Sequence, residues 1–355
     1  MEYELVIDAR LLYGSGIGTY LRNLIIPISE KYHTKILTNS KSLERYPIFK
    51  NLDFEILNSS IYSIREQFEL FNKIPKCKLF WSPHYNVPLL PINAKKKLVT
   101  IHDVFHLAYF HELSLSQKIY SKVLIQLAST VSNKIITVSN FSKREIIKHT
   151  GVKSNKIEVI YNGIDFCEIQ AITIRVPKKY FLFVGNLKPH KNIKILLEAF
   201  SKFTLQNTEY KLVIVGKKEG LKTVDRESLT IIEQDKTKNN IIFLENISDE
   251  ELVYIYKNAV ASVFPSLYEG FGYPPLESIV QNTPCICSDI EVLHEVYGES
   301  VIYFNPTDSN ALNEKLQNVI NEHHFLTKES KEKIISKYSL DNFVKCHIEL
   351  IEKLL

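Results

Sequence analysis

The sequence is poor in the features that mark redox, secreted and membrane-spanning proteins. Its five cysteines form no C-x-x-C pair, which argues against a redox or zinc-binding motif. The odd cysteine count and the lack of a signal-like N-terminal segment lead us to expect a cytoplasmic protein. No run approaches the roughly eighteen apolar residues of a membrane span. Cys285 and Cys287, in the strand-like run "TPCICSD", are interpreted as small core residues.

A glycine-rich stretch near the N-terminus, "LLYGSGIGTYL", follows the expected strand "YELVIDAR". Gly14, Gly16 and Gly18 are typical of a loop whose backbone amides approach a phosphate. The dinucleotide fingerprint needs a third glycine where Thr19 stands, and the next strand, "HTKILTNS", ends without a ribose-binding carboxylate. The stretch therefore favours a phosphate-binding loop but disfavours a nicotinamide enzyme.

Charge is unevenly distributed between the two halves. Residues 1–165 contain 22 Lys+Arg against 14 Asp+Glu, a net of +8, and since the whole chain is +4, residues 166–355 carry −4. A basic half fits an anionic ligand, an anionic membrane surface or only a solvated lysine-rich face. Nucleic acid is not expected, because no aromatic–basic alternation accompanies the charge. The candidate membrane-facing lysines are Lys95, Lys96, Lys97, Lys118, Lys122, Lys134, Lys143 and Lys148.

Short apolar runs alternate with helix-like segments along the whole chain, as in α/β proteins with parallel sheets. The expected strands of the first half are "YELVIDA", "TKILTN", "KLFWSP", "KLVTIHD", "KIITVS" and "IEVIYN". Those of the second half are "YFLFVGN", "YKLVIVG", "NIIFLE", "ASVFPS" and "TPCICSD". The S-x-x-E patterns at Ser142–Glu145 and Ser248–Glu251 predict capping boxes, and Gly151 is a plausible helix C-cap.

The fold class predicted is two Rossmann-like, doubly wound α/β domains facing a central cleft. The periodicity is lost at about residues 166 to 178, which places the boundary between a domain 1–168 and a domain 169–335. Ligands of such sheets bind beyond the carboxyl ends of the strands, so a cleft between the domains is the expected site. The last helix, 336–355, has Phe343, Cys346, Ile348 and Ile351 at helical spacings and is expected to pack back on the first domain.

The segment "SVFPSLYEGFGYPPLESIVQNTPCICSD" holds the strongest candidate site. A strand ends at "FPS", a glycine-bearing loop follows, and a helix is expected to begin near Pro274. Glu269 lies in the loop and Glu277 in the first turn of the helix, where one carboxylate suits ligand hydroxyls and the other a reacting centre. The backbone amides of residues 270–272 suit a phosphate-linked, polyhydroxylated ligand. The alternative is that these are helix-start acids favoured by the helix dipole.

Two segments of the first half end strands with polar side chains. In "TIHDVFH", His102 and Asp103 follow a strand, while His102 and His106 also have the spacing of metal ligands on a helix. No third ligand is evident, so a metal is not expected. In "WSPHYNVPLLP", the side chains of residues 84–86, namely His84, Tyr85 and Asn86, suit stacking and hydrogen bonding with a sugar, or else the loop packs on its own aromatics.

The Glu-x7-Glu pattern of "EGFGYPPLE" resembles the signature of the family 4 retaining glycosyltransferases of the GT-B fold. The resemblance covers nearly the whole chain. It includes "GSGIGTYLRNL", "TIHDV", "VSNFSKREI", "VIYNGID", "FVGNLKPHKNIKILLEAF" and "ISDEELVYIYKNA", in the family's order. The resemblance implies that the first domain binds an acceptor and the second a nucleotide diphosphate-sugar.

The resemblance also implies roles for individual residues. Glu277 accepts the two ribose hydroxyls, and Glu269 lies against the transferred sugar, whose hydroxyls contact the amides of the Gly270–Gly272 loop, chiefly those of Phe271 and Gly272. Lys191 contacts the diphosphate as a compact cation. From the first domain, Gly16 and Ile17 offer amides to the diphosphate, and His102 contacts the sugar near its primary hydroxyl. The acceptor-binding candidates are His84, Tyr85, Asn86 and Asp103.

The sequence departs from the family at the phosphate strand. Many relatives have an arginine after the glycine of this strand, whereas here Asn186 follows Gly185. Lys188 and His190 are the alternatives for a second positive group at the diphosphate, beside the predicted donor-site residues Gly185, Asn186 and Lys191.

The resemblance implies retaining transfer of a hexose to a glycan or lipid-linked glycan at the inner face of the cytoplasmic membrane. Mannose from GDP-mannose is favoured, because the N-terminal half and "GNLKPHKN" resemble bacterial mannosyltransferases of surface polysaccharide synthesis. No metal or other cofactor is expected, since the sequence has no Asp-x-Asp triplet. The alternatives are a phosphorylase-like enzyme or nucleotide-sugar epimerase of the same architecture and a non-catalytic nucleotide-sugar-binding protein.

Overall fold

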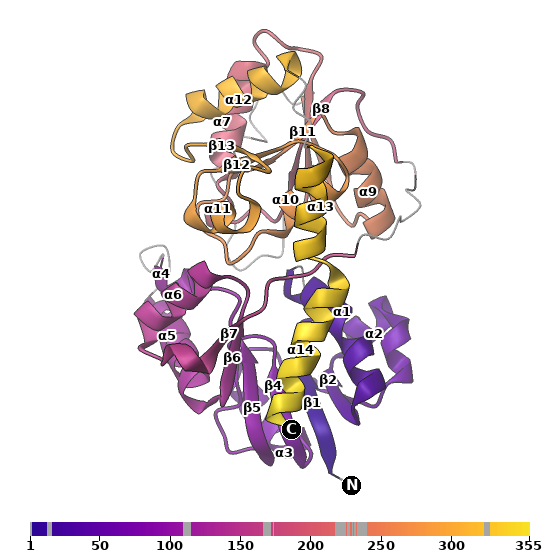
Figure 1. The fold of residues 1–355 in the computed structure, drawn as a ribbon, viewed down its shortest axis with the longest axis vertical. Coiled ribbons are helices and arrows are strands. Elements are labelled where there is room, and N and C mark those ends of the chain that lie inside the picture. Colours follow the sequence, from indigo (N-terminus) through magenta and orange to yellow (C-terminus); the bar gives the residue numbers. More distant parts are fainter. Residues whose placement is uncertain are drawn as a thin grey trace. The chain divides into compact units, whose positions relative to one another are not determined.

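The computed structural model divides the chain into two compact units (Figure 1). Unit 1 comprises Met1–Gly163 and Tyr338–Leu355, and unit 2 comprises Ile164–Lys337. The sequence places these boundaries at 168/169 and 335/336. The structure describes residues 2–12, 16–108, 115–165, 172, 174–216, 225, 228, 230, 232, 240–322 and 327–355, without the side chains of 45 and 115–120. Gly14, Cys167 and the side chain of Lys118 lie outside this description.

Unit 1 is built on a parallel sheet whose described strands run in the order β3-β2-β1-β4-β5-β6-β7. This 3-2-1-4-5-6 order is that of doubly wound α/β folds, as the sequence predicts. The strand that sequence analysis missed is β3, whose three residues are only partly buried. The strands are β1 (Tyr3–Asp8), β2 (Thr34–Thr38), β3 (Phe54–Ile56), β4 (Cys77–Ser82), β5 (Ala94–Thr100), β6 (Lys134–Thr137) and β7 (Ile157–Val159).

Helices cover both faces of this sheet. The helical elements are α1 (Gly16–Lys31), α2 (Ser40–Arg45), η1 (Pro47–Asn51), α3 (Ile64–Lys73), α4 (Phe105–Ala108), α5 (Leu115–Val131), α6 (Asn140–Thr150), η3 (Ser154–Lys156) and α14 (Leu340–Leu354). On one face α1 and α14 share a core with Leu5, Leu79 and Leu98. On the other, α3 packs through Leu70 on Val6 and Phe80, and α5 and α6 pack beside it.

One predicted helix start in unit 1 is wrong. The N-cap of α6 is Ser139, whose Oγ accepts the amide hydrogen of Ser142 at 3.0 Å, so Ser142 lies inside the helix and no capping box runs from Ser142 to Glu145. Both serines precede helix-like residues, and the sequence pattern alone selects the wrong one. The predicted C-cap is confirmed, since Gly151 has a left-handed φ of 69°.

The C-terminal helix α14 (yellow in Figure 1) is held to unit 1 by apolar and polar contacts. Phe343 and Ile351 are buried as expected, whereas Cys346 and Ile348 are only partly buried. The side chain that sequence analysis missed is His347, which is fully buried and lies 2.5 Å from the Tyr20 hydroxyl. Burial lowers the pKa of His347 to about 4, so this histidine is neutral near pH 7.

Unit 2 repeats the strand order, with β10-β9-β8-β11-β12-β13 as the described part of its parallel sheet. Its strands are β8 (Tyr180–Val184), β9 (Lys211–Val215), β10 (Ile241–Leu244), β11 (Ala261–Phe264), β12 (Cys285–Ser288) and β13 (Ile302–Phe304). Its helical elements are η4 (Pro189–Lys191), α7 (Ile193–Phe203), α9 (Asp249–Asn258), α10 (Tyr273–Val280), α11 (Glu291–Tyr297), α12 (Ser309–Asn321) and α13 (Lys328–Lys337). Strand β13 was not predicted.

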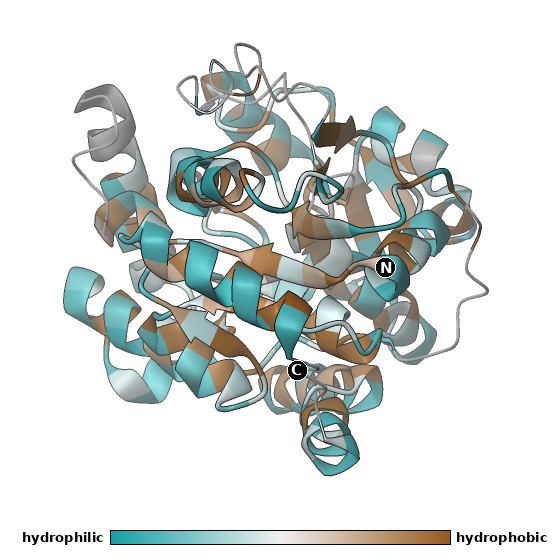
Figure 2. Cartoon of the chain, turned by 90° about the horizontal axis from the view of Figure 1, so that it is seen from above, coloured by the Kyte–Doolittle hydropathy of each residue, from teal (hydrophilic) through white to brown (hydrophobic). Residues whose placement is uncertain are grey.

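The local predictions in unit 2 agree with the structure. Ser248 caps α9 in a reciprocal capping box with Glu251. Cys285 and Cys287 are buried free thiols on one side of β12, with their sulfurs 3.4 Å apart. Figure 2 shows the mixture of hydrophilic and hydrophobic residues along the helices, as amphipathic layers over a buried sheet require. Within the described ranges no helix is long and apolar enough to cross a membrane.

Candidate active site

In unit 2 the loop after β11 leads directly into α10. Gly272 is the N-cap residue of α10, with a φ of 90° that disfavours any side chain. A Cβ at this position would also lie 3.1 Å from the Phe264 ring. Proline occupies the first turn, where the missing amide hydrogen costs nothing. The Tyr297 hydroxyl donates to the Gly272 carbonyl, and Phe271 is buried, so the loop amides are held in a fixed arrangement.

Glu277 lies in α10 and is hydrogen-bonded to a tyrosine of the neighbouring helix α9. The Tyr256 hydroxyl donates to Glu277 Oε2 at 2.7 Å, and Tyr256 is buried with an exposed fraction of 1%. Burial raises the pKa of Glu277 above its ordinary value, and the Tyr256 hydrogen bond only partly offsets this. Tyr256 therefore fixes one carboxylate oxygen. The sequence pattern does not distinguish Tyr256 from the other residues of "ISDEELVYIYKNA".

Glu269 and Lys191 form an ion pair between the loops that follow β11 and β8. Their side chains are 13% and 19% exposed, and Lys191 Nζ also lies 5.3 Å from the centre of the Phe264 ring. The backbone joins the same loops, because the Leu267 amide donates to the His190 carbonyl at 2.8 Å. The structure thus brings together two residues, 78 positions apart, that the sequence assigns to one ligand.

Residues 185–191, which the sequence predicts to form a phosphate-binding loop, lie beyond the carboxyl end of β8. The Gly185 amide donates to the Val215 carbonyl, and the Lys188 amide donates to the Asn186 carbonyl at 2.8 Å. The turn is anchored by Asn192, which has a left-handed φ of 53°. Its side-chain amide donates to the carbonyls of Pro265 and Pro306, at 3.1 and 2.8 Å. Asn192 was missed, although an asparagine before a helix is a known turn signal.

In unit 1, His102 lies two residues beyond the end of β5. Its Nε2 is 2.9 Å from the Pro83 carbonyl, and its ring lies edge-on to Tyr20. Burial lowers the pKa of His102 to about 4. The neutral ring then donates from Nε2 to Pro83 and keeps Nδ1 as an acceptor, which suits a contact with a sugar hydroxyl.

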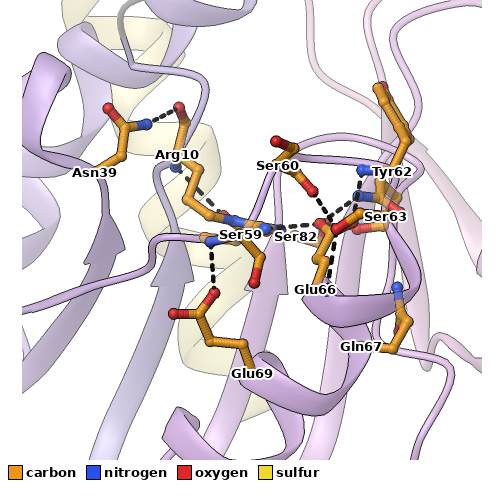
Figure 3. A network of polar contacts seen from close by, with 12 residues as sticks. Arg10, Asn39, Ser59, Ser60, Tyr62, Ser63, Glu66, Gln67, Glu69 and Ser82 are labelled. Atoms are coloured by element: carbon orange, nitrogen blue, oxygen red, sulfur yellow. Dashed lines mark hydrogen bonds and ion pairs between the residues drawn. The ribbon is translucent and has the colours of Figure 1, made fainter.

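A buried polar network lies at the carboxyl ends of β1 and β4, and sequence analysis identified only part of it. Arg10 donates to both carboxylate oxygens of Asp8, at 2.8 and 2.6 Å, and lies 2.6 Å from Glu66 Oε1. Asn86 donates to the same Glu66 oxygen at 2.6 Å, and His84 Nε2 lies 3.3 Å from Asp8. Figure 3 shows Arg10 reaching Glu66 beneath the turn that holds Tyr62.

The opposite charges of Asp8 and Arg10 stabilise each other within this network. Burial raises the pKa of Asp8, but the charge and hydrogen bonds of Arg10 outweigh burial and leave the pKa well below its ordinary value. The pKa of Arg10 is raised by Asp8 and Glu66 against the opposite effect of burial. His84 Nδ1 accepts a hydrogen bond from the backbone amide of Asn86 at 3.1 Å. The ring hydrogen is therefore on Nε2, which faces Asp8. His84 and Asn86 are thus buried parts of the loop scaffold.

The other predicted residues of unit 1 lie in a loop or near the start of a helix. Tyr85 stacks on Tyr62 with ring centres 6.4 Å apart. Asp103 Oδ1 accepts the Phe105 amide hydrogen at 2.9 Å at the start of α4. Gly16 and Ile17 begin α1, and a Cβ at Gly16 would meet nothing within 4 Å.

Gly18, by contrast, is required by packing. A Cβ there would lie 2.7 Å from the Leu12 carbonyl, so this glycine lets α1 approach the chain that follows β1. Across the part of the chain that the structure describes, no group of three His, Cys, Asp or Glu side chains is placed to hold a metal ion.

The chain belongs to a family of glycosyltransferases. Residues 16–166 match the family described as "Glycosyltransferase Family 4", and residues 167–339 match "Glycosyl transferases group 1". The O-antigen chain mannosyltransferase RfbU of Salmonella typhimurium is 32% identical over 260 residues, covering 73% of this chain and 69% of that protein. The O-antigen chain mannosyltransferase B of Escherichia coli is 28% identical over 236 residues, covering 63% and 61%.

Solved structures place the fold in the GT-B class. Sucrose-phosphate synthase from Thermosynechococcus elongatus superimposes with a TM-score of 0.77 at 17% identity, covering 99% of each chain. Anabaena HepE in complex with UDP-glucose gives a TM-score of 0.78 at 13% identity, covering 99% of this chain and 100% of that one. The predicted fold class and family are therefore confirmed.

Proposed function

We propose that this glycosyltransferase is a retaining mannosyltransferase that transfers mannose from GDP-mannose to a glycan or lipid-linked glycan in the cytoplasm. The observation that carries the proposal is the ion pair of Lys191 with Glu269, which lies in the loop that leads into α10, the helix that holds Glu277. Support for mannose comes from the relatives RfbU and mannosyltransferase B, which are named for mannosyl transfer in O-antigen chains.

The residues of unit 2 suit the parts of such a donor. Glu277 presents one carboxylate oxygen to the ribose hydroxyls while Tyr256 holds the other. Lys191 supplies a cation to the diphosphate, and the ion pair with Glu269 keeps the lysine in place before the donor arrives. Glu269 and the amides of residues 270–272 then receive the hydroxyls of the transferred sugar. From unit 1, the family resemblance assigns amides of Gly16 and Ile17 to the diphosphate.

The reaction proposed is a front-face transfer that keeps the α configuration of the donor. The acceptor hydroxyl attacks the anomeric carbon while the bond to the diphosphate breaks, and the departing phosphate takes the acceptor proton. Lys191 stabilises the charge that develops on the leaving group. Neutral His102, with Nδ1 as acceptor, orients a sugar hydroxyl. No metal enters this scheme.

Calorimetric melting of the full chain against GDP-, UDP-, dTDP- and CMP-sugars tests the donor assignment. A ligand at a hundred times its dissociation constant adds about 2.7 kcal/mol to native stability. We expect GDP-mannose and GDP to raise the melting temperature of the wild type and of the control Glu198→Ala, but not of Glu277→Ala. A response to UDP-sugars alone would overturn the choice of base.

Product analysis tests the chemistry. With GDP-mannose and an acceptor glycan, we expect an α-linked mannosyl product by NMR, formed equally well with a chelator present. A β-linked product would contradict retention, and loss of activity with the chelator would contradict metal independence. Epimerised donor without any transfer would favour an epimerase, and binding without turnover on any acceptor a non-catalytic protein.

A further inference from the structure

Four buried polar side chains of unit 1 are hydrogen-bonded in series from β4 to the C-terminal helix. They are Trp81 of β4, Thr100 of β5, Tyr20 of α1 and His347 of α14, and each is fully buried. The Trp81 indole donates to Thr100 Oγ1 at 3.0 Å, and the Tyr20 hydroxyl lies 3.3 Å from the same oxygen and 2.5 Å from His347 Nε2. His347 Nδ1 lies 2.8 Å from the Phe343 carbonyl. These four side chains are called the Tyr20 cluster below.

The direction of each hydrogen bond in the Tyr20 cluster follows from its two ends. The Phe343 carbonyl can only accept, so the proton of the neutral His347 ring is on Nδ1, and Nε2 accepts from the Tyr20 hydroxyl. At the other end the Trp81 indole can only donate. The Tyr20 proton is used on His347, so the Thr100 hydroxyl donates to the Tyr20 oxygen. An apolar replacement in the series therefore leaves a buried neighbour without a partner.

Tyr20 connects this cluster to His102. The two ring centres are 4.8 Å apart and the ring planes are nearly perpendicular, at 87°. The His102 backbone is held separately, because the Ser142 hydroxyl donates to its carbonyl at 3.1 Å. The freedom that is left to His102 is rotation of its side chain, which the Tyr20 ring and the Pro83 carbonyl, 2.9 Å from Nε2, both restrict.

The orientation of the His102 ring decides which nitrogen meets a ligand. His102 is partly exposed, whereas the Tyr20 cluster is fully buried and acts only through its neighbours. While Nε2 donates to Pro83, Nδ1 is left as the acceptor for a sugar hydroxyl. Apolar side chains would also fill the space behind His102, but only directional hydrogen bonds fix the rotation of the ring that packs on it.

We propose that Tyr20 and His347 are positioning residues that hold the His102 ring in the orientation required for sugar transfer. This inference rests on the proposed function, in which His102 orients a sugar hydroxyl. It gives the C-terminal helix α14 a part in the reaction although His347 touches no ligand. A cluster that only supports the fold affects stability, whereas a positioning cluster also affects turnover, and does so through His102.

Steady-state kinetics of two variants at one position tests the inference. His347→Leu removes the acceptor of the Tyr20 hydroxyl, whereas His347→Gln keeps a side-chain oxygen that can accept it. We expect His347→Leu to lower kcat about fivefold with KM for the donor unchanged, and His347→Gln to keep at least about half of the wild-type kcat. Leu350→Ala, at a buried α14 leucine outside the cluster, is the matched control and should lower the melting temperature but not kcat.

The same substitution in a His102→Ala background separates positioning from general damage. If the cluster acts through His102, His347→Leu causes no further loss of kcat once the His102 ring is absent. Equal losses in the two backgrounds would overturn the inference, and so would a wild-type kcat in His347→Leu. Tyr20→Phe, which keeps the ring but removes its hydroxyl, gives the same comparison if His347→Leu does not fold.

NMR of the ring nitrogens in ¹⁵N-histidine-labelled full-length protein tests the inference without turnover. The His102 signals are identified by their loss in His102→Ala. We expect one His102 tautomer, protonated at Nε2, in the wild type and in His347→Gln, and a mixture of tautomers in His347→Leu. An unchanged His102 tautomer in His347→Leu would overturn the inference. Full turnover by His102→Ala would instead contradict the role of His102 in the proposed function, while the spectra alone would still decide whether the cluster holds its ring.

Discussion

The two units share one strand order but use their polar residues differently. In unit 2 the candidate site comes from two loops and the start of α10, and its Lys191 and Glu269 side chains are 19% and 13% exposed. In unit 1 the charged groups at the corresponding strand ends are paired with one another and buried, as Asp8, Arg10 and Glu66 are. Unit 2 is also acidic, with 20 Lys+Arg against 24 Asp+Glu, where unit 1 is basic.

The comparison shows that one fold can use the polar residues at its strand ends in two ways, to contact a ligand or to hold its own loops. In the proposed function, residues 185–192 and 269–277 of unit 2 contact the donor, whereas the buried network of unit 1 holds its own loops. Buried ion pairs are sensitive to loss of one partner, while exposed loop residues are sensitive in function and tolerant in stability. The four predictions below test this contrast from the largest expected effect to the smallest.

Arg10→Met should have the largest effect on stability. The substitution leaves Asp8 and Glu66 as uncompensated buried carboxylates, which costs about 3–5 kcal/mol. The measurement is urea unfolding followed by the fluorescence of Trp81, which is the single tryptophan, is fully buried and reports on unit 1. The control is Lys179→Met in unit 2, where the pair with Glu209 is about half exposed, and calorimetry should show a loss of less than about 1 kcal/mol.

A loss below about 1 kcal/mol in Arg10→Met as well would remove the contrast between the two units, because the buried network would then matter no more than a surface ion pair.

Lys191→Ala should have the largest effect on catalysis. Removing the cation at the diphosphate is expected to lower kcat/KM by about 100- to 1000-fold, with little change in the melting temperature of the free protein. Steady-state kinetics with the donor identified by melting gives the measurement. Lys188→Ala is the matched variant, and we expect it to lose less. Equal losses would contradict the assignment of Lys191 as the principal diphosphate contact.

The stability of unit 1 should depend on pH through His347. Its pKa is about 4 in the folded state, against about 6.5 when unfolded, so the unfolded chain binds more protons between these values. Stability therefore falls as the pH falls from 6.5 toward 4, by about 3 kcal/mol from this residue. Trp81 fluorescence during urea unfolding at several pH values measures the slope. His347→Gln should make the slope shallower without abolishing it, because the pKa of His102 in the same unit is also lowered to about 4, and an unchanged slope would show that other groups cause the acid sensitivity.

Tyr256→Phe should have the smallest effect. The variant loses the hydrogen bond that orients Glu277, so we expect KM for the donor to rise about tenfold with kcat nearly unchanged. The pKa of Glu277 should also rise, because the hydrogen bond lowers it, and the acidic limb of the KM profile should move to higher pH. Tyr254→Phe, two residues away on α9, is the control. A fall in kcat alone would argue against a positioning role.

Much of unit 2 was predictable because its signals are local. The capping box at Ser248, the proline-started helix after Gly272 and the strands around them all follow from short patterns, and each agrees with the structure. The family motif located Glu269, which the structure pairs with Lys191, and Glu277 in the helix that follows. The three-residue strand β13 was not predicted.

In unit 1 the sequence was less informative, for a physical reason. Asp8 and Arg10 look like the ordinary end of a strand, and Glu66 like one of the exposed acids of a helix, since nothing near them in the chain shows their pairing. His347 likewise reads as a polar interruption of an apolar helix. Only packing shows that it meets Tyr20, 327 positions away. The helix start at Ser142 failed because two serines competed for one cap.

The sequence by itself determined the strand–helix alternation, the parallel sheets and the family, because these depend on residue types at short, regular spacing. Tertiary structure alone decided which polar groups are buried together and which tyrosine holds Glu277. Those outcomes depend on contacts between distant segments, and such contacts are set by how helices and sheet pack rather than by any local pattern.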